Sequence, residues 1–278
     1  MKPPRFRVGV CSWSLRPEHP DQLIGLLAQI GITRVQLALV PCVDAPQWQG
    51  AVGTLRSRGL SIASGMLATV GEDYTTLESI ARTGGVRPDA TWPQTRDLAA
   101  RVAALAATES IGLVTFHAGF IPHDHGTERT MMVSRLREVA DQFKALGVAV
   151  AFETGQESAD TLADALREID HPAIGVNFDP ANMILYGMGD PVAAVRTLAP
   201  WIRQVHIKDA LPASRVGEWG QEVQVGTGAV QWPAFIGALR DLGRPLDLVI
   251  EREAGAARSG DVRVAMDRLR TWCGSDLE

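Results

Sequence analysis

The stretch "GVNFDPANMILYG", residues 175 to 187, is apolar up to Val176 and then carries Asn177, Asp179 and Asn182 within six positions. A proline follows the aspartate directly, and proline suits the first position of a helix. Since aspartate is a favoured N-cap residue, the stretch predicts a buried strand that ends at Asp179 and leads into a helix. The carboxylate would then stand at the carboxyl end of the strand.

Similar short runs, rich in apolar and β-branched residues, recur along the whole chain. They are continuously apolar rather than alternating, which is typical of parallel strands covered on both faces. Eight strands are predicted, at residues 6–13, 34–39, 60–66, 112–119, 148–154, 173–179, 202–209 and 246–253. Segments with helical periodicity lie between or after them, at residues 20–31, 46–59, 95–112, 127–147, 158–170, 190–200, 231–243 and 261–272. Several of these segments end at a glycine, which is a common helix stop signal.

This alternation of strand and helix predicts an α/β fold, the (β/α)8 TIM barrel. An open doubly wound sheet is the alternative, but no GxGxxG sequence opens the first helix. No linker or low-complexity tract divides the chain, so we predict a single domain over residues 1–278. The long segments 68–96 and 208–229 are predicted to be active-site excursions, because loops of this length in compact domains are usually functional.

Composition and charge narrow the classes of function. The formal net charge of −5 is spread without a basic run, which gives no support to nucleic-acid binding. The three cysteines form no CxxC pair, so we expect reduced, buried thiols. The N-terminal apolar run is too short for a signal peptide, and no window approaches the roughly 20 apolar residues of a membrane helix. We therefore expect a cytoplasmic protein that does not bind membranes.

Ionisable residues stand at the predicted ends of five consecutive strands, where TIM barrels carry their active sites. They are His117, Glu153, Asp179, His206 followed by Lys208, and Glu251 followed by Arg252. Each has an ordinary alternative role. Asp179 could simply cap a helix, His117 could be a hydrogen-bonded core residue, Lys208 could form a solvated pair, and Arg252 could neutralise the glutamates.

Four of these residues together predict a metal site: Glu153, Asp179, His206 and Glu251. Buried carboxylates that share no cation cost roughly several kcal/mol each. Three carboxylates and one imidazole suit Mn²⁺, Mg²⁺ or Co²⁺ in octahedral geometry, while Zn²⁺ stays open. Two coordination positions would remain for the adjacent oxygens of a sugar. A Lewis acid there would favour removal of a proton next to a carbonyl.

Six sequence motifs now show a resemblance that covers essentially the whole chain. In order they are "FHAG", "FETGQES", "NFDPANMILYG", "VHIKDA", "VGTGAVQWPAF" and "LVIEREAG". Their order and spacing resemble the xylose isomerase-like TIM-barrel superfamily, in particular its sugar phosphate isomerase/epimerase branch. That branch includes ketose 3-epimerases, inosose dehydratase and hydroxypyruvate isomerase. The resemblance implies a divalent-metal-dependent isomerase or epimerase of a ketose or keto-polyol, with Mn²⁺ as the favoured ion, and it allows a homodimer or homotetramer.

The resemblance also implies roles for individual residues. Glu153, Asp179, His206 and Glu251 would bind the metal, and Glu153 and Glu251 would exchange protons with the substrate from opposite faces. His117 would line the substrate-binding site. Asn182 departs from the pattern, since many epimerases have a histidine there; an amide can bind a hydroxyl group but cannot titrate.

Three further residues are candidates for substrate contact. Lys208 could bind a carboxylate, phosphate or hydroxyl group, or act as the acid of an elimination. Arg252 is placed near the mouth by its position after Glu251. Trp13 could stack on the apolar face of a sugar or belong to the core.

Alternative functions share parts of this pattern. A metal-dependent dehydratase or lyase would begin with the same proton abstraction. A non-catalytic sugar-binding barrel would be expected to lack at least one of the four metal residues, and none is missing. The superfamily's apurinic endonucleases need further histidines, one of them where this chain has Asn182, and the excursion after the seventh strand contains none. A small carbohydrate is therefore the expected partner.

Overall fold

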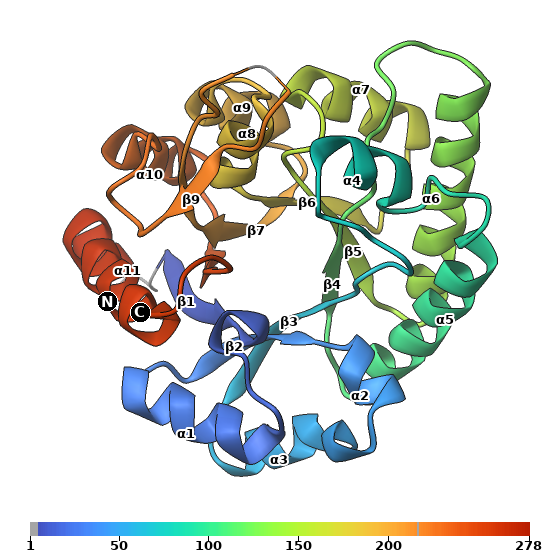
Figure 1. Ribbon diagram of the computed structural model, residues 1–278. Helices are drawn as coiled ribbons and strands as arrows, with labels where there is room; N and C mark the ends of the chain where they lie inside the picture. The colour runs from blue at the N-terminus through green and yellow to red at the C-terminus, as the bar shows by residue number, and fades with distance from the viewer. Residues whose placement is uncertain (1–4, 216) are drawn as a thin grey trace.

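The barrel is closed by eight parallel strands, and the computed structural model describes residues 5–215 and 217–278 (Figure 1). Around the barrel the strand order is β1-β10-β7-β6-β5-β4-β3-β2. Their bounds are β1 Phe6–Cys11, β2 Arg34–Ala38, β3 Ser61–Met66, β4 Leu113–Phe116, β5 Ala149–Glu153, β6 Ile174–Phe178, β7 Ile202–Ile207 and β10 Leu246–Ile250. All eight predicted strands are thus confirmed, and so is the TIM barrel.

Helices surround the strands as an outer ring (Figure 1). Eight of the described helices are α1 Pro20–Ile30, α3 Ala51–Ser57, α5 Trp92–Thr108, α6 Thr127–Ala145, α7 Ala159–Ile169, α9 Pro191–Leu198, α10 Trp232–Asp241 and α11 Arg258–Cys273. Each coincides with a segment of predicted helical periodicity. Their apolar faces pack on the barrel, for example through the fully buried Leu23 and Leu27 of α1. None of the described helices is both long and apolar enough to cross a membrane.

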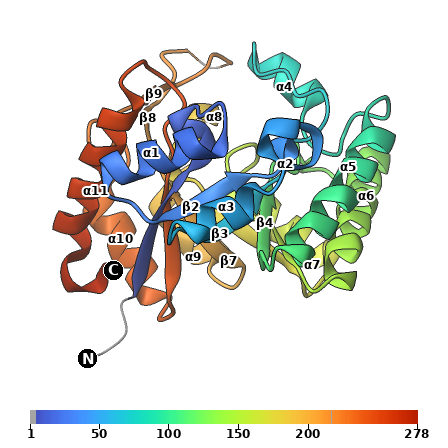
Figure 2. The same ribbon diagram turned by 90° about the horizontal axis from the view of Figure 1, so that it is seen from below.

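The two predicted excursions contain short elements that the sequence did not predict. Segment 68–96 carries α4 (Leu77–Thr83) before α5 begins. Segment 208–229 folds back as an antiparallel hairpin of β8 (Asp209–Leu211) and β9 (Gln221–Val223). Figure 2 shows α4 and the hairpin at one end of the barrel. Two further short helices, α2 (Val40–Asp44) and α8 (Pro180–Tyr186), follow β2 and β6.

The turn from β6 into α8 forms as the opening stretch predicts. Asp179 is the N-cap of α8, and its Oδ1 accepts a hydrogen bond from the Asn182 backbone nitrogen at 2.9 Å. The loop after β5 passes close to this turn at Gly155, whose φ is +134°. A Cβ at Gly155 would lie 2.4 Å from the Cβ of Asn182, so glycine is required there. The ends of β5 and β6 are thereby held against each other.

Candidate metal centre

Strand order brings the four predicted metal ligands together. Glu153 ends β5, Asp179 follows β6, His206 belongs to β7 and Glu251 follows β10, and these strands are consecutive neighbours in the barrel. Each residue offers one ligand atom, and the four atoms lie within 4.8 Å of one another. All four side chains are buried. Glu153 and Glu251 stand at the two ends of this row, with Asp179 and His206 between them.

The imidazole of His206 is the common neighbour of the three carboxylates. Its Nδ1 lies 3.5 Å from Glu153 Oε1, 3.6 Å from Asp179 Oδ2 and 3.4 Å from Glu251 Oε2. These separations leave the atoms grouped around a common centre rather than bonded in pairs. The arrangement suits four ligand atoms that converge on one cation.

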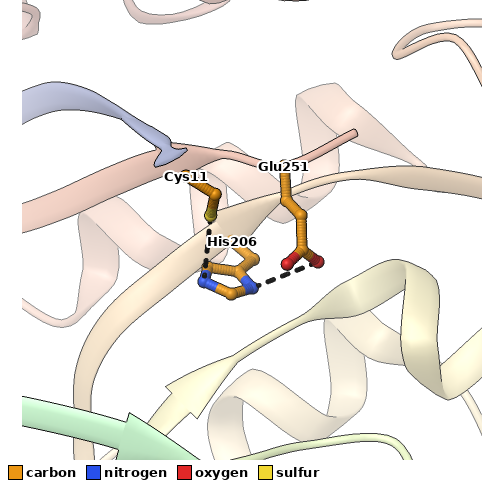
Figure 3. A group of neighbouring side chains, drawn as sticks. All are labelled: Cys11, His206 and Glu251. Atoms are coloured by element: carbon orange, nitrogen blue, oxygen red, sulfur yellow. Dashed lines mark hydrogen bonds and ion pairs between the residues drawn. The ribbon is translucent and has the colours of Figure 1, made fainter. Parts of the chain in front are cut away.

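The other ring nitrogen of His206, Nε2, contacts the side chain of Gln36. His206 Nε2 lies 2.7 Å from Gln36 Oε1, an acceptor, and 3.0 Å from Asn177 Nδ2, a donor, and we assign the ring proton to Nε2 because the contact with Gln36 is the shorter of the two. In the neutral imidazole, Nδ1 then presents its lone pair to the carboxylates, as a metal ligand must. The Cys11 thiol lies on the Nε2 side, 3.7 Å away (Figure 3). Burial raises the pKa of Cys11 well above its ordinary value, and its thiol donates to Gln36 Oε1 at 3.4 Å, so Cys11 stands apart from the ligand atoms grouped around Nδ1, although it could form a second group with His206 and Glu251.

Two buried atoms of the cluster lack a hydrogen-bond partner, namely Asp179 Oδ2 and His206 Nδ1. The Asp179 oxygen and, in the neutral ring, the His206 nitrogen are electron-pair donors that face the same space, and buried polar atoms are rarely left unsatisfied. Burial raises the pKa of Asp179, and Lys208 offsets this only in part. Burial lowers the pKa of His206, but Glu153 and its other neighbours raise it well above the ordinary value. The cluster therefore favours a positive charge at its centre, and its residues fit a divalent ion.

Neighbouring donors orient the two glutamates. Glu153 accepts hydrogen bonds from Asn177 Nδ2 at 3.1 Å and from Asn182 Nδ2 at 2.8 Å. Glu251 accepts from Trp13 Nε1 at 2.7 Å and from Lys208 Nζ at 2.8 Å. Burial opposes ionisation of Glu251, but Lys208 and His206 hold its pKa well below the ordinary value. Burial also opposes ionisation of Glu153, but the imidazoles of His206 and His117 lower its pKa. Both glutamates are therefore carboxylates.

A cavity of about 680 Å³ opens above the cluster. Of the predicted substrate-contact residues, Trp13, His117, Asn182 and Lys208 line it, together with Glu251. Arg252 is not brought to the cavity. Its guanidinium instead donates to Glu222 and Asp261, each at 2.8 Å, and so ties β9 and α11 to the end of β10.

Asn182 and Trp13 have roles beyond those predicted from the sequence. The Asn182 amide spans the cluster, because it donates to Glu153 and its Oδ1 accepts from Lys208 Nζ at 3.2 Å. The indole of Trp13 positions Glu251. His117 has a buried Nδ1 without a partner, and its Nε2 lies 3.8 Å from Glu153 Oε1.

Sequence reasoning missed the polar layer beneath the cluster. Gln36, Asn177 and Gln204 are fully buried in the barrel, and Gln204 Nε2 donates to Asn177 Oδ1. A signal existed, since Asn177 and Gln204 each stand two residues before a metal ligand. In a strand, residues two apart point to the same face, so both amides had to point inward.

The "VGTGAVQW" motif, residues 225 to 232, supplies most of the hydrogen bonds to the buried carboxylate of Asp209. This carboxylate accepts hydrogen bonds from the backbone nitrogens of Ala210, Gly226, Gly228 and Val230 and from the indole nitrogen of Trp232. A Cβ at Gly228 would lie 2.2 Å from Asp209 Oδ1, so this glycine permits the close approach. The motif closes the excursion after β7 onto one buried acid.

Comparisons with known proteins agree with this fold. A family model described as xylose isomerase-like TIM barrel matches residues 24–272. A solved xylose isomerase domain protein from Planctomyces limnophilus is 29% identical, with a TM-score of 0.85 and 98% of each chain covered. D-psicose 3-epimerase from Clostridium cellulolyticum H10 is 15% identical, with a TM-score of 0.70 over 96% of this chain and 99% of that one. A xylose isomerase-like TIM barrel protein from Mycobacterium smegmatis, in complex with magnesium, is 16% identical, with a TM-score of 0.69 over 100% of this chain and 98% of that one.

A curated relative matches over a shorter region. Uncharacterized protein YihM of Escherichia coli (strain K12) is 29% identical over 129 residues, which cover 45% of this chain and 39% of the relative. The family match spans most of the chain, and the closed barrel agrees with it. The protein belongs to the xylose isomerase-like TIM barrel family.

Proposed function

We propose that the protein is a divalent-metal-dependent sugar isomerase or epimerase, which removes a proton next to the carbonyl of a ketose or keto-polyol. The observation that carries the proposal is the position of Glu153 and Glu251 at opposite ends of the row of four converging ligands. Mn²⁺ is the proposed ion, since the donor set is oxygen-rich with one imidazole; Mg²⁺, Co²⁺ and Zn²⁺ are the alternatives. A small carbohydrate is the proposed substrate.

In this reaction Glu153 and Glu251 would transfer the protons, and neighbouring side chains would hold the two carboxylates in place. One glutamate takes the proton from the substrate carbon, and the other returns a proton from the opposite side. Asn177 and Asn182 hold the Glu153 carboxylate in place, while Trp13 and Lys208 hold that of Glu251. A divalent ion bound by the four side chains would polarise the substrate carbonyl and balance the negative charge that develops.

The test is deuterium incorporation in D2O, read by NMR on a panel of ketoses and inososes with the Mn²⁺-loaded protein. Glu153→Gln and Glu251→Gln should each abolish exchange at the carbon next to the carbonyl while the circular dichroism spectrum is unchanged. Glu218→Gln, an exposed glutamate on the excursion after β7, is the matched control and should retain exchange. Near wild-type exchange in either of the first two variants would refute the two-base assignment.

A dehydratase is the second candidate, and the position of Lys208 favours it. Its ammonium group lines the cavity beside Glu251, where it could protonate a departing hydroxyl group. Mass spectrometry of the same reactions would separate the two functions. An epimerase gives products of unchanged mass, whereas a dehydratase gives a product lighter by one water molecule.

A further inference from the structure

The cavity has a polar floor and an aromatic outer wall. Glu251, Lys208 and His117 belong to the floor around the metal cluster. The outer wall includes Tyr186 and Trp219, whose ring centroids are 4.9 Å apart. Tyr186 is held from behind by Phe120, with ring centroids 5.6 Å apart. Because aromatic faces pack against the apolar faces of rings, this wall suits a cyclic group that lies away from the reacting carbon.

Tyr74 adds a further ring from the excursion after β3. It lines the cavity beside His117, with ring centroids 6.1 Å apart, and 43% of its surface is exposed. Tyrosine and tryptophan that remain exposed at the mouth of a cavity are typical of ligand contacts, since their apolar bodies are otherwise better buried.

The charges in the cavity disfavour a phosphorylated substrate. Lys208 is the only lysine or arginine among the described residues that line it. An ammonium group has three N–H donors, and Lys208 directs them to Asn182 Oδ1, Glu251 Oε2 and Glu253 Oε2, at 3.2, 2.8 and 2.6 Å. An anion could bind this group only by displacing one of these three partners.

Carboxylates outnumber the cations at the mouth. Glu72, Glu222 and Glu253 all line the cavity. The nearby Arg258 lies outside it and donates to the carbonyl oxygens of Trp13 and Gly255. A phosphate group would therefore lie among like charges without a free guanidinium or ammonium partner.

We infer that the substrate is an uncharged glycoside, whose reacting sugar lies on the polar floor while a second ring packs against Trp219 and Tyr186. The inference rests on the proposed function for the position of the reacting sugar. It adds that a ring at the remote end increases affinity and that a phosphate there decreases it.

Three matched probes test this inference: D-fructose, D-fructose 6-phosphate and isomaltulose, which carries a glucosyl group on the same O6 of fructose. Binding to the Mn²⁺-loaded protein is measured by calorimetry, and deuterium exchange is followed in parallel. Isomaltulose should bind about tenfold more tightly than fructose, and fructose 6-phosphate about tenfold more weakly. The inference is wrong if the phosphate binds as tightly as isomaltulose, or if isomaltulose has no advantage over fructose.

A pair of variants locates the subsite for the second ring. Trp219→Ala should remove the advantage of isomaltulose and leave fructose binding unchanged, whereas Trp219→Phe, which keeps a ring, should retain most of it. Equal effects of Trp219→Ala on both sugars would overturn the assignment of this wall. Preferential binding of isomaltulose without exchange of any probe would refute the proposed function and still support the glycoside subsite.

Discussion

Gln36 favours the tautomer of His206 in which the lone pair of Nδ1 faces the carboxylates. Its Oε1 accepts the Nε2 proton at 2.7 Å, and its Nε2 donates to Thr115 Oγ1 at 2.8 Å. Groups that orient a metal-binding histidine typically contribute about 10- to 100-fold to metal affinity. The prediction is that Gln36→Leu weakens Mn²⁺ binding by this factor, measured by competition with a chromophoric chelator.

Thr115→Val is the matched control for Gln36. It removes the partner at the other end of the amide and leaves the Oε1 acceptor in place, so Mn²⁺ affinity should fall by a smaller factor. Unchanged affinity in Gln36→Leu would show that the imidazole is oriented by its other neighbours.

Glu157 makes stability depend on pH. Burial raises its pKa to about 8, and one carboxylate oxygen has no hydrogen-bond partner. The folded protein therefore keeps a proton that the unfolded chain releases above about pH 4.5. The contribution of Glu157 is fully present below that pH, falls by about 1.4 kcal/mol per pH unit above it, and reaches its lowest value near pH 8.

The expected outcome is that Glu157→Gln, which cannot ionise, raises the melting temperature more at pH 8 than at pH 5. The difference should be several degrees, because each kcal/mol shifts the melting temperature by roughly 2–4 °C in a chain of this size. Thermal unfolding at the two pH values measures it. Glu138→Gln, on the exposed face of α6, serves as control and should show no such pH dependence. An equal shift at both pH values would mean that Glu157 is ionised in the folded protein.

At the scale of elements, the β8–β9 hairpin and the loop that follows depend on Asp209. Five N–H groups converge on its carboxylate, and hydrogen bonds to a charged group contribute roughly 1.5–3 kcal/mol each. Asp209→Asn keeps the shape but places an N–H donor among N–H donors. It should lower the unfolding free energy by about 3 kcal/mol in urea titrations and speed tryptic cleavage after Arg215.

Asp247→Asn provides the comparison, since Asp247 pairs with Arg7 and Arg34 near the amino ends of β10, β1 and β2. It should destabilise the protein without speeding cleavage after Arg215. Similar cleavage rates in the two variants would show that Asp209 supports the barrel generally rather than the excursion.

The long elements were predictable because each carries its own pattern. A continuous apolar run such as β6 and a helical period such as that of α7 are visible without the rest of the chain. Helix α2 has only five residues, helix α4 has seven and lies inside an excursion, and the β8–β9 hairpin is fixed by contacts of Asp209 with residues up to 23 positions away. Tertiary contacts, rather than local propensity, specify these elements.

At the scale of the whole molecule, the convergence of the four candidate metal ligands was predictable and the cavity wall was not. The barrel places every strand end at one mouth, so the predicted strands also predicted the convergence of Glu153, Asp179, His206 and Glu251. A side chain that follows the end of a strand is not constrained by the sheet to point into the barrel. Arg252 accordingly donates to Glu222 and Asp261 and does not line the cavity. Trp219 and Tyr74 reach the wall through excursions whose course depends on long-range contacts.

The proposed metal site would link the folding of the whole barrel to metal binding, because its four candidate ligands come from four strands that assemble only in the folded state. A ligand that binds only the folded state stabilises it by about 2.7 kcal/mol at a concentration 100 times its Kd. We therefore expect Mn²⁺ to raise the melting temperature of chelator-treated protein by roughly 5–10 °C at that concentration.

Asp179→Asn separates the metal effect from folding. Asparagine caps a helix about as well as aspartate, so α8 should remain formed, but the amide replaces the carboxylate whose Oδ2 faces the cluster. The variant should fold, bind Mn²⁺ much more weakly and show little thermal shift when the ion is added. Scanning calorimetry of both proteins with and without Mn²⁺ provides the measurement. A shift in the variant equal to that of the wild type would place the stabilising ion outside this cluster, and absence of a shift in the wild type would refute metal binding at the barrel mouth.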